Sequence, residues 1–157
     1  MISYKQSQNI LKKSKIYIGD EMVRTQNCLN RVLAINIFCK ENNPADNNAA
    51  FDGFAISSKD TKRLSKKKSK LFKIIGSIAA GDKPLNKKVK KFSAIEIMTG
   101  GIIPKHFDTI IPIEKIIFYP NKKNPKYIIV HKEVKKYQHV RFKGSDYKKN
   151  DLILTKI

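Results

Sequence analysis

The stretch PADNNAAFDGFAI, Pro44–Ile56, is unusual in a chain that is otherwise crowded with lysine. Its thirteen residues include no lysine, and Asp46 and Asp52 are its only charges. The Asn42-Asn43-Pro44 run that leads into it is typical of a loop, and Phe54–Ser57 at its end is typical of a strand. Asp52 therefore stands beside a glycine at the mouth of a predicted strand, where side chains often meet a substrate. The plainer alternative is an Asp-Gly turn with an asparagine-rich entry.

The charge of the whole chain is strongly positive. Its 157 residues carry 33 lysines and arginines against 13 aspartates and glutamates, a formal net charge of +20. A balance of this kind can indicate a nucleic-acid or other polyanionic partner. The basic residues are nearly all lysine, however, whereas recognition of phosphates and bases favours arginine. The abundance of lysine, isoleucine and asparagine favours compositional bias, so that binding of nucleic acid is the less favoured interpretation.

Several classes of protein and site are disfavoured. The sequence has no apolar run long enough for a transmembrane helix, and its N-terminus lacks a secretory signal pattern. Cys28 and Cys39 lie in apolar segments and are expected to be buried thiols in a reducing compartment, which favours a cytoplasmic location. His106, His131 and His139 lack the paired spacing of metal ligands, and the common glycine-rich nucleotide loops are missing.

The order of predicted elements indicates a mixed α+β fold that is mainly β. Ser3 is predicted to cap a helix over Tyr4–Lys15, and a first strand is expected within Ala34–Cys39. Short strand-like runs then follow one another between turns: Phe54–Ser57, Leu71–Ile78, Ala94–Met98, Thr109–Ile117, Tyr127–Lys132, Val140–Lys143 and Leu152–Leu154. Many short strands at this spacing predict a closed or sandwiched, mainly antiparallel β module.

Two further clusters resemble Pro44–Ile56 in chemical character. In IEIMTGGIIP, Ile95–Pro104, a predicted strand ends in Thr99 and two glycines follow, so that a hydroxyl and free backbone N–H groups could hold an oxyanion. In VRFKGSD, Val140–Asp146, an arginine, a lysine and a carboxylate could grip an oxyanion or a phosphate. Each cluster also has a plainer interpretation, as a loop after a strand and as a surface turn with an ion pair.

In this order, the three clusters resemble the molybdopterin molybdenumtransferase family, to which the enzymatic region of gephyrin also belongs. NNAAFDGFA, Asn47–Ala55, matches the first family signature in register, with Phe54 in place of a tyrosine. Ile97–Gly100 matches the family's I-M-T-G motif. Arg141, Gly144 and Asp146 match its R-x-x-G-x-D motif. Weaker matches lie at Cys28–Ala34, Ala79–Gly81, Pro104–Ile111 and Glu114.

The resemblance implies a two-domain organisation. Residues 1–41 with 140–157 would form an elongated, dimer-forming α/β first domain, and residues 42–139 would form an inserted β-rich domain resembling a barrel or sandwich. Family members continue into a pterin-binding domain and a small C-terminal β domain, and neither has a counterpart in these 157 residues. In family dimers the active site lies between the pterin-binding domain of one subunit and the second domain of the other.

The resemblance also implies a function, which is the insertion of molybdenum into adenylated molybdopterin during molybdenum cofactor biosynthesis. This chain would supply the second-domain side of the site, with molybdate and adenylated molybdopterin as substrates. The expected catalytic residues are Asp52, Thr99 and Asp146. The expected substrate-binding residues are Gly53, Gly100, Arg141 and Gly144. Mg²⁺ would be the cofactor, with Asp52 and Asp146 as its candidate ligands. The partner would be a second copy of the chain or a separate pterin-binding chain.

Two other functions stay open. A truncated or split member of the family could act as a non-catalytic scaffold that dimerises or docks another chain. A basic polyanion binder would instead bind DNA or RNA with a steep dependence on salt.

Overall fold

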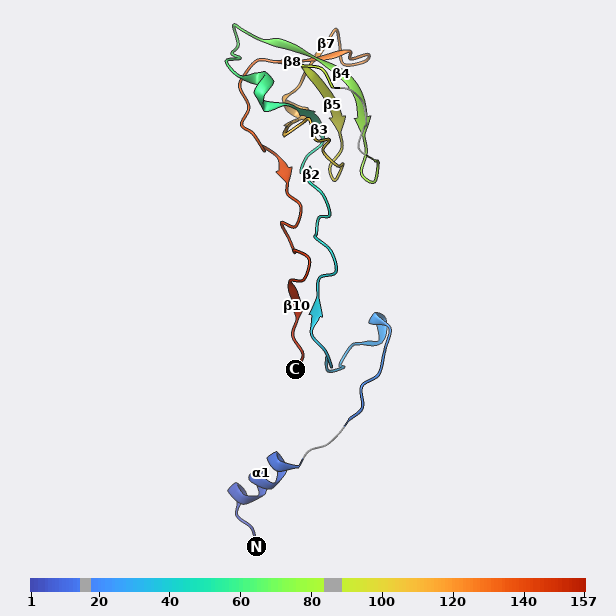
Figure 1. The fold of residues 1–157 in the computed structure, drawn as a ribbon, viewed down its shortest axis with the longest axis vertical. Helices are drawn as coiled ribbons and strands as arrows, with labels where there is room; N and C mark the ends of the chain where they lie inside the picture. Colours follow the sequence, from blue (N-terminus) through green and yellow to red (C-terminus); the bar gives the residue numbers. More distant parts are fainter. Residues whose placement is uncertain (15–17, 84–88) are drawn as a thin grey trace. The chain divides into compact units, whose positions relative to one another are not determined.

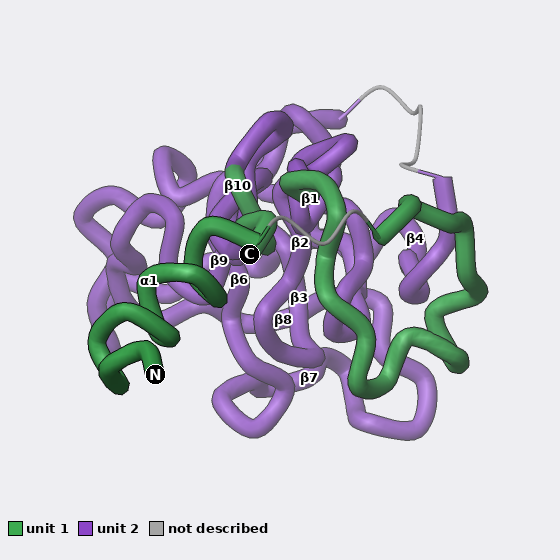
Figure 2. Tube along the Cα trace, turned by 90° about the horizontal axis from the view of Figure 1, so that it is seen from below, with its two compact units in different colours: residues 1–37, 152–157 green, residues 38–151 purple. Residues whose placement is uncertain are grey.

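The computed structural model describes residues 1–14, 18–83 and 89–157. These residues form two compact units, which Figure 2 shows in different colours. Unit 1 contains Met1–Ile37 and Leu152–Ile157, and unit 2 contains Phe38–Asp151. The domain boundaries expected from the family resemblance, at residues 42 and 139, stay a prediction.

The N-terminal helix of unit 1 begins where the sequence predicts. Helix α1 spans Tyr4–Lys13, and Ser3 caps it in a reciprocal arrangement. The Gln6 N–H donates to Ser3 Oγ at 3.3 Å, and the Ser3 N–H donates to Gln6 Oε1 at 2.8 Å. Lys15, where the helix was expected to end, lies outside the described residues. Unit 1 also contains a short 3-10 helix, η1 (Thr25–Asn27).

The two segments that lead to and from the β-rich part of unit 2 are paired. Strand β1 (Ile37–Phe38) forms a two-stranded sheet with β10 (Leu152–Leu154). Within unit 2, backbone hydrogen bonds of 2.8 Å run from Cys39 to Asp151 and from Asn43 to Tyr147. Strand β2 (Asn48–Ala49) then pairs antiparallel with β9 (Val140–Arg141). In Figure 1 these incoming and outgoing segments of unit 2 run side by side.

A six-stranded sheet forms the main part of unit 2, and it confirms the mainly β fold. Its strand order is β6-β3-β5-β4-β8-β7, with only the β4–β5 pair parallel. The strands are β3 (Gly53–Ile56), β4 (Lys70–Ile78), β5 (Ser93–Ile97), β6 (Thr109–Pro112), β7 (Ile117–Tyr119) and β8 (Tyr127–Val130). Two 3-10 helices, η2 (Ser58–Thr61) and η3 (Ile113–Lys115), lie between strands.

The expected single strand over Thr109–Ile117 is wrong. Helix η3 interrupts it, so that β6 and β7 lie at opposite edges of the sheet. The apolar pattern continues through Ile113 and Ile116, which explains why the sequence gives little warning of the break. Figure 1 shows the resulting sheet as curled rather than flat.

Strand β3 is buried on both faces of the sheet. Phe54 and Ile56 pack in one apolar cluster with Phe72 and Ile128, while Ala55 belongs to a second cluster with Ile95, Ile97 and Phe107. Because successive side chains of a strand point to opposite faces, these two clusters lie on the two sides of the sheet. A strand buried in this way has no position for a lysine, which would lose its hydration there.

The two cysteines are not buried as the sequence predicts. Cys28 is exposed and Cys39 is half-buried, and both are free thiols, so the expectation of two buried thiols is wrong. No helix in the described part of the chain is long and apolar enough to cross a membrane.

The backbone of β6 passes very close to Gly53. A Cβ atom added at Gly53 would lie 2.1 Å from the carbonyl oxygen of Ile111, which belongs to the paired strand β6. The obstacle is backbone that is held in the sheet, so it cannot move aside as a flexible side chain would. Only glycine fits this position without displacing β6.

We expect the substitution Gly53→Ala to destabilise unit 2 by about 2–4 kcal/mol, because the new methyl group overlaps the backbone of β6. The measurement is the free energy of unfolding from urea titration followed by circular dichroism. The matched control is Gly19→Ala, since a Cβ at Gly19 would meet nothing within 4 Å. Equal stability of the two variants would contradict this steric argument.

Candidate functional site

One short segment, Asn47–Ala50, holds the second predicted cluster in place. The Ala49 N–H donates to the Gly101 carbonyl at 3.0 Å, and the Gly100 N–H donates back to the Ala49 carbonyl at 2.9 Å. The Ile103 N–H also donates to the Asn47 carbonyl at 3.0 Å. The loop that follows Thr99 therefore runs alongside Asn47–Ala50 as an irregular strand.

The same segment holds the third cluster on its other side. Asn48 and Ala49 pair with Arg141 and Val140 in the β2–β9 ladder. The side chain of Asn47 adds a further contact, because its Oδ1 accepts a hydrogen bond of 2.9 Å from the Lys143 N–H. All three clusters identified in the sequence thus meet at β2, although they are separated by about fifty and forty residues along the chain.

Asp52 of the first cluster and Thr99 of the second are hydrogen-bonded to each other. The backbone N–H and the hydroxyl of Thr99 both donate to Asp52 Oδ1, each at 2.7 Å. The backbone hydrogen bond, and then the hydroxyl hydrogen bond, lower the pKa of Asp52 below its ordinary value. Both side chains are exposed, and Oδ2 of Asp52 accepts none of the hydrogen bonds found within the described residues. The site therefore presents an ionised carboxylate with one oxygen available.

This contact changes the role expected of Thr99. The sequence suggested free N–H groups after β5 that could hold an oxyanion. In the structure the N–H groups of Thr99, Gly100 and Gly101 donate to Asp52, Ala49 and Met98 respectively. Thr99 thus positions Asp52, and the predicted oxyanion cradle at these three amides is not formed.

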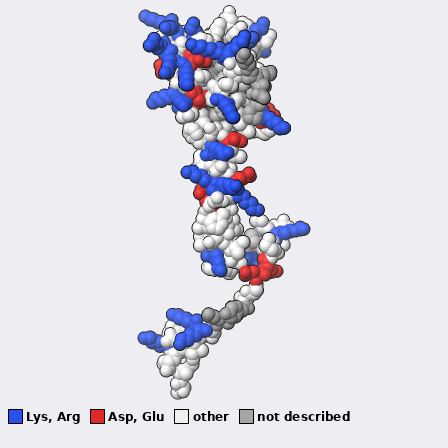
Figure 3. Space-filling model, in the orientation of Figure 1, with Lys and Arg blue, Asp and Glu red and all other residues white. Residues whose placement is uncertain are grey.

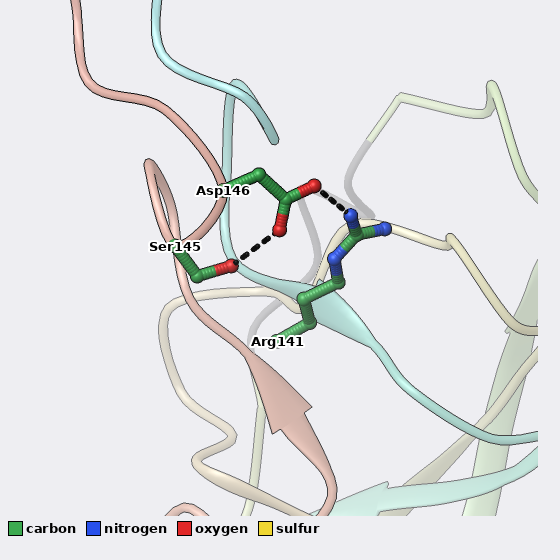
Figure 4. Close-up of polar contacts among 3 residues, drawn as sticks. All are labelled: Arg141, Ser145 and Asp146. Atoms are coloured by element: carbon green, nitrogen blue, oxygen red, sulfur yellow. Dashed lines mark hydrogen bonds and ion pairs between the residues drawn. The ribbon is translucent and has the colours of Figure 1, made fainter. Parts of the chain in front are cut away.

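The third cluster contains an ion pair at the surface. Arg141 Nη2 pairs with Asp146 Oδ2, and the Ser145 hydroxyl donates to Asp146 Oδ1 at 3.3 Å, as Figure 4 shows. Both charged side chains are largely exposed, so the pair adds only about 0–1 kcal/mol to stability. This agrees with the plainer interpretation of the cluster as a turn with an ion pair, but it also leaves a charged guanidinium accessible to a ligand.

The glycines of the predicted site have conformational roles. Gly144 has φ +68° and lies against the Asn42 side chain, and Gly100 has φ +82°. Residues other than glycine rarely adopt this left-handed region. Gly53 is required by the close approach of β6 described above. These glycines shape the site, and a role in binding substrate is a separate prediction.

The carboxylates of the site offer few ligands for a divalent cation. Among the described residues, no group of three or more histidine, cysteine, aspartate or glutamate side chains is placed to hold a metal ion. Mg²⁺ is commonly bound by only one or two carboxylates, with phosphate oxygens and water as its remaining ligands. Asp52 fits that pattern, since its exposed carboxylate is ionised. Both oxygens of Asp146 already accept hydrogen bonds.

Sequence reasoning missed the position that connects the clusters. Asn47 was part of the matched signature but received no role of its own, yet it contacts Ile103 through its carbonyl and Lys143 through its side chain. Its amide side chain within the lysine-free segment was the available signal, because such side chains often bond to nearby backbone.

Comparison with known proteins gives a match over nearly the whole chain. The family model described as MoeA N-terminal region (domain I and II) matches residues 2–157. The chain is 28% identical over 155 residues to a molybdopterin molybdenumtransferase of Staphylococcus epidermidis, covering 99% of this chain and 36% of that relative. It is 31% identical over 137 residues to a molybdopterin molybdenumtransferase of Bacillus subtilis, covering 87% and 31%.

Solved structures give the same match. A crystal structure of the molybdopterin biosynthesis MoeA protein from Pyrococcus horikoshii aligns with a TM-score of 0.83 and 28% identity, covering 99% of this chain and 38% of that one. A second, from strain OT3, aligns with a TM-score of 0.76 and 30% identity, covering 87% and 34%. The chain therefore spans about a third of the length of the relatives it matches.

We expect the pKa of Asp52 to lie below its ordinary value of 3.8 and to rise in Thr99→Val, which loses the hydroxyl donor but keeps the N–H donor. The rise should be partial, because the backbone hydrogen bond is the larger cause. Side-chain carboxyl chemical shifts followed by NMR during a pH titration measure the value. Thr99→Ser is the matched control and should keep the low pKa.

The lowered pKa of Asp52 also makes the stability of the fold depend on pH. Since the folded-state pKa is lowered, ionised Asp52 favours the folded state above pH 3.8, and this contribution is lost as the pH falls through the folded-state value. A pKa for Asp52 that is identical in wild type and Thr99→Val would contradict the hydrogen bond to the hydroxyl.

Proposed function

Because the chain belongs to the family of the MoeA N-terminal region (domain I and II), we propose that it supplies the second-domain side of a site that inserts molybdenum into adenylated molybdopterin. The relatives it matches carry the name molybdopterin molybdenumtransferase. The reaction would belong to molybdenum cofactor biosynthesis and take place in the cytoplasm. Since the chain spans about a third of those relatives, the pterin-binding side of the site would come from outside these residues.

One observation carries this proposal most directly. The ionised carboxylate of Asp52 and the guanidinium of Arg141 come from clusters far apart in the sequence, and both clusters are fixed to the segment Asn47–Ala50. A carboxylate and a cationic guanidinium presented by clusters that attach to the same segment suit a substrate that combines a phosphoanhydride with an oxyanion. An arrangement needed only for folding would not require either charge to be exposed.

Asp52 is the residue that we expect to take part in cleavage of the adenylate. An ionised carboxylate can orient an attacking water toward phosphorus by accepting a hydrogen bond from it. Thr99 acts through Asp52, by fixing the position of Oδ1 and keeping the carboxylate ionised. If Mg²⁺ binds, Asp52 is its candidate ligand in this chain, and the ion would neutralise charge on the phosphate oxygens.

The third cluster would meet the oxyanion. Molybdate is a tetrahedral dianion, and a guanidinium offers several N–H donors in a fixed plane. Arg141 uses Nη2 in its pair with Asp146, so its other N–H groups can serve a ligand. Asp146 would then hold the guanidinium in position, which is a narrower role than the catalytic one expected from the family resemblance.

The partner is proposed to be a second copy of the chain, or a separate chain with a pterin-binding domain. The residues of α1 are exposed or half-buried, including the apolar Tyr4, Ile10 and Leu11. An apolar helix face of this kind is usually covered in an assembly. The scaffold alternative also predicts an assembly. Only a measurement of molybdenum-insertion activity therefore separates the scaffold from the proposed function. Binding of nucleic acid is the less favoured function.

We expect Asp52→Asn to lower molybdenum insertion at least about a hundredfold, because the uncharged amide lacks the negative charge that would orient the attacking water or bind Mg²⁺. The assay combines the purified chain, a separate pterin-binding domain, adenylated molybdopterin and molybdate, and measures the cofactor by activation of an apo-molybdoenzyme. Thr99→Val should lower the rate less than Asp52→Asn does.

Lys66→Gln is the matched control for this assay, because Lys66 is an exposed residue that belongs to none of the three clusters. Unchanged insertion by both Asp52→Asn and Thr99→Val would overturn the assignment of this site. Absence of turnover in the wild-type chain, with or without the pterin-binding domain, would favour the scaffold.

A self-association experiment tests the partner. We expect the wild-type chain to sediment as a dimer and Leu11→Lys to raise the dissociation constant at least about tenfold, since it places a charge on the apolar face of α1. Analytical ultracentrifugation over a concentration series measures the constant, with Lys12→Gln as the control on the same helix. A monomer at all concentrations would contradict the homodimer and leave the pterin-binding chain as the proposed partner.

A further inference from the structure

Unit 2 has a groove of about 930 Å³ that none of the predicted catalytic residues lines. Its volume is within the range of about 300–1,000 Å³ that is typical of small-molecule sites. The buried Pro104 and Phe107 and the half-buried Ile103 give it an apolar lining. Asn47 and Lys143 also line it, so the groove adjoins the segment at which the three clusters meet.

The charged residues of the groove are mainly basic. The basic lining residues are Lys59, Lys105, His106, Lys136 and Lys143, and the acidic ones are Asp46 and Asp108. Four lysines and two aspartates leave a formal excess of two positive charges with histidine neutral. Asp108 is already engaged, because its two oxygens accept hydrogen bonds from the Ser58 N–H at 2.7 Å and from the Ser58 hydroxyl at 2.9 Å. The groove therefore favours an anion.

Tyr137 gives the groove an aromatic wall whose position is fixed. Its side chain is 47% exposed, and the Lys136 ammonium lies 4.4 Å from the centroid of its ring. Hydrogen bonding and charge interaction with Tyr137, and then the charge of Asp108, raise the pKa of Lys136, so this lysine stays charged. The rings of Tyr137 and Phe142 pack in a T-shaped arrangement, with 5.2 Å between the ring centroids.

The backbone at this wall is strained. Tyr137 has φ +65° and His139 has φ +58°, values that bulky residues with a side chain rarely adopt. The Tyr137 N–H donates to the Asp108 carbonyl at 2.8 Å, which holds the strained conformation. Strain of this kind costs about 1–3 kcal/mol per residue and is concentrated at functional sites.

We propose that this groove binds a phosphate-bearing ligand with a planar ring system, in which the lysines meet the phosphates and the ring lies against Tyr137. A nucleoside diphosphate has this chemistry. That the natural ligand is the adenylated substrate rests on the proposed function, whereas binding of the nucleotide does not. In that case the groove would hold the phosphate-linked nucleotide part of that substrate.

Non-specific attraction is the main competitor of this proposal. Figure 3 shows lysine and arginine side chains widely spread over the visible surface of unit 2, with fewer acidic ones among them. With a net charge of +20, the chain would attract any anion weakly at low salt. The experiment must therefore compare lysines inside the groove with lysines outside it at equal net charge.

The test is calorimetric titration of the full chain with ADP, pyrophosphate and adenosine at an ionic strength of about 0.15 M. We expect ADP to bind more tightly than either of the other two probes. Lys136→Gln and Lys105→Gln should each weaken ADP binding about threefold to tenfold, as expected for loss of one charge-assisted contact. Lys66→Gln and Lys122→Gln are the matched controls, since both lysines are exposed, do not line the groove and change the net charge equally.

The outcomes separate this proposal from its competitor and from the proposed function. Equal weakening by groove and control substitutions, or no measurable ADP binding, would overturn the groove as a nucleotide site. Adenosine or pyrophosphate binding as tightly as ADP would also overturn it. If ADP binds in the groove while Asp52→Asn retains full insertion activity, the proposed catalytic site fails and the groove stands.

Discussion

The hydrogen bonding of Asn47–Ala50 on both of its edges is the constraint on which the site depends. On one edge it fixes the loop from Gly100 to Ile103, and on the other it fixes β9 and the turn after it. Asp52 follows two residues after this segment and Gly53 begins β3, so the register of the segment also sets which way the carboxylate points. A shift by one residue would turn each side chain of the segment to the opposite face and separate Asp52 from Thr99.

The absence of lysine from Pro44–Ile56 has a structural explanation that the sequence did not supply. Residues 53–56 form a strand buried on both faces, where an ammonium group would be expensive. Residues 47–50 pair on both edges, and their small side chains allow the close approach of two neighbouring segments. A lysine near Asp52 would also compete with Thr99 for its carboxylate. Burial alone explains why β3 contains no lysine. Competition for the Asp52 carboxylate is needed only to explain the absence of lysine from residues close to Asp52.

Local features were the most predictable part of the structure. The capping box at Ser3 and the strand at Leu152–Leu154 follow from short patterns, and the predicted strands at Phe54–Ser57 and Ala94–Met98 are each shifted by one residue. The interruption by η3, the parallel pairing of β4 with β5 and the exposure of Cys28 depend on long-range packing, which periodicity does not contain. In the candidate site, the partner of the Thr99 hydroxyl could not be predicted from the sequence. From the sequence alone the hydroxyl could bind an anion, whereas in the structure it donates a hydrogen bond to Asp52.

The residues of the site differ in what their substitution can reveal. Gly53 is required for β6 to pair with β3, so loss of activity on changing it would report on folding as much as on chemistry. Asp52, Thr99 and Arg141 are exposed and contribute little to the packed core, since exposed polar contacts of this kind add little to stability. Loss of activity on changing one of these exposed residues would therefore report on the surface site more than on the packed core. The same reasoning applies to Lys136 and Lys105 of the groove, because each can lose its charge without disturbing the buried clusters on either side of the sheet.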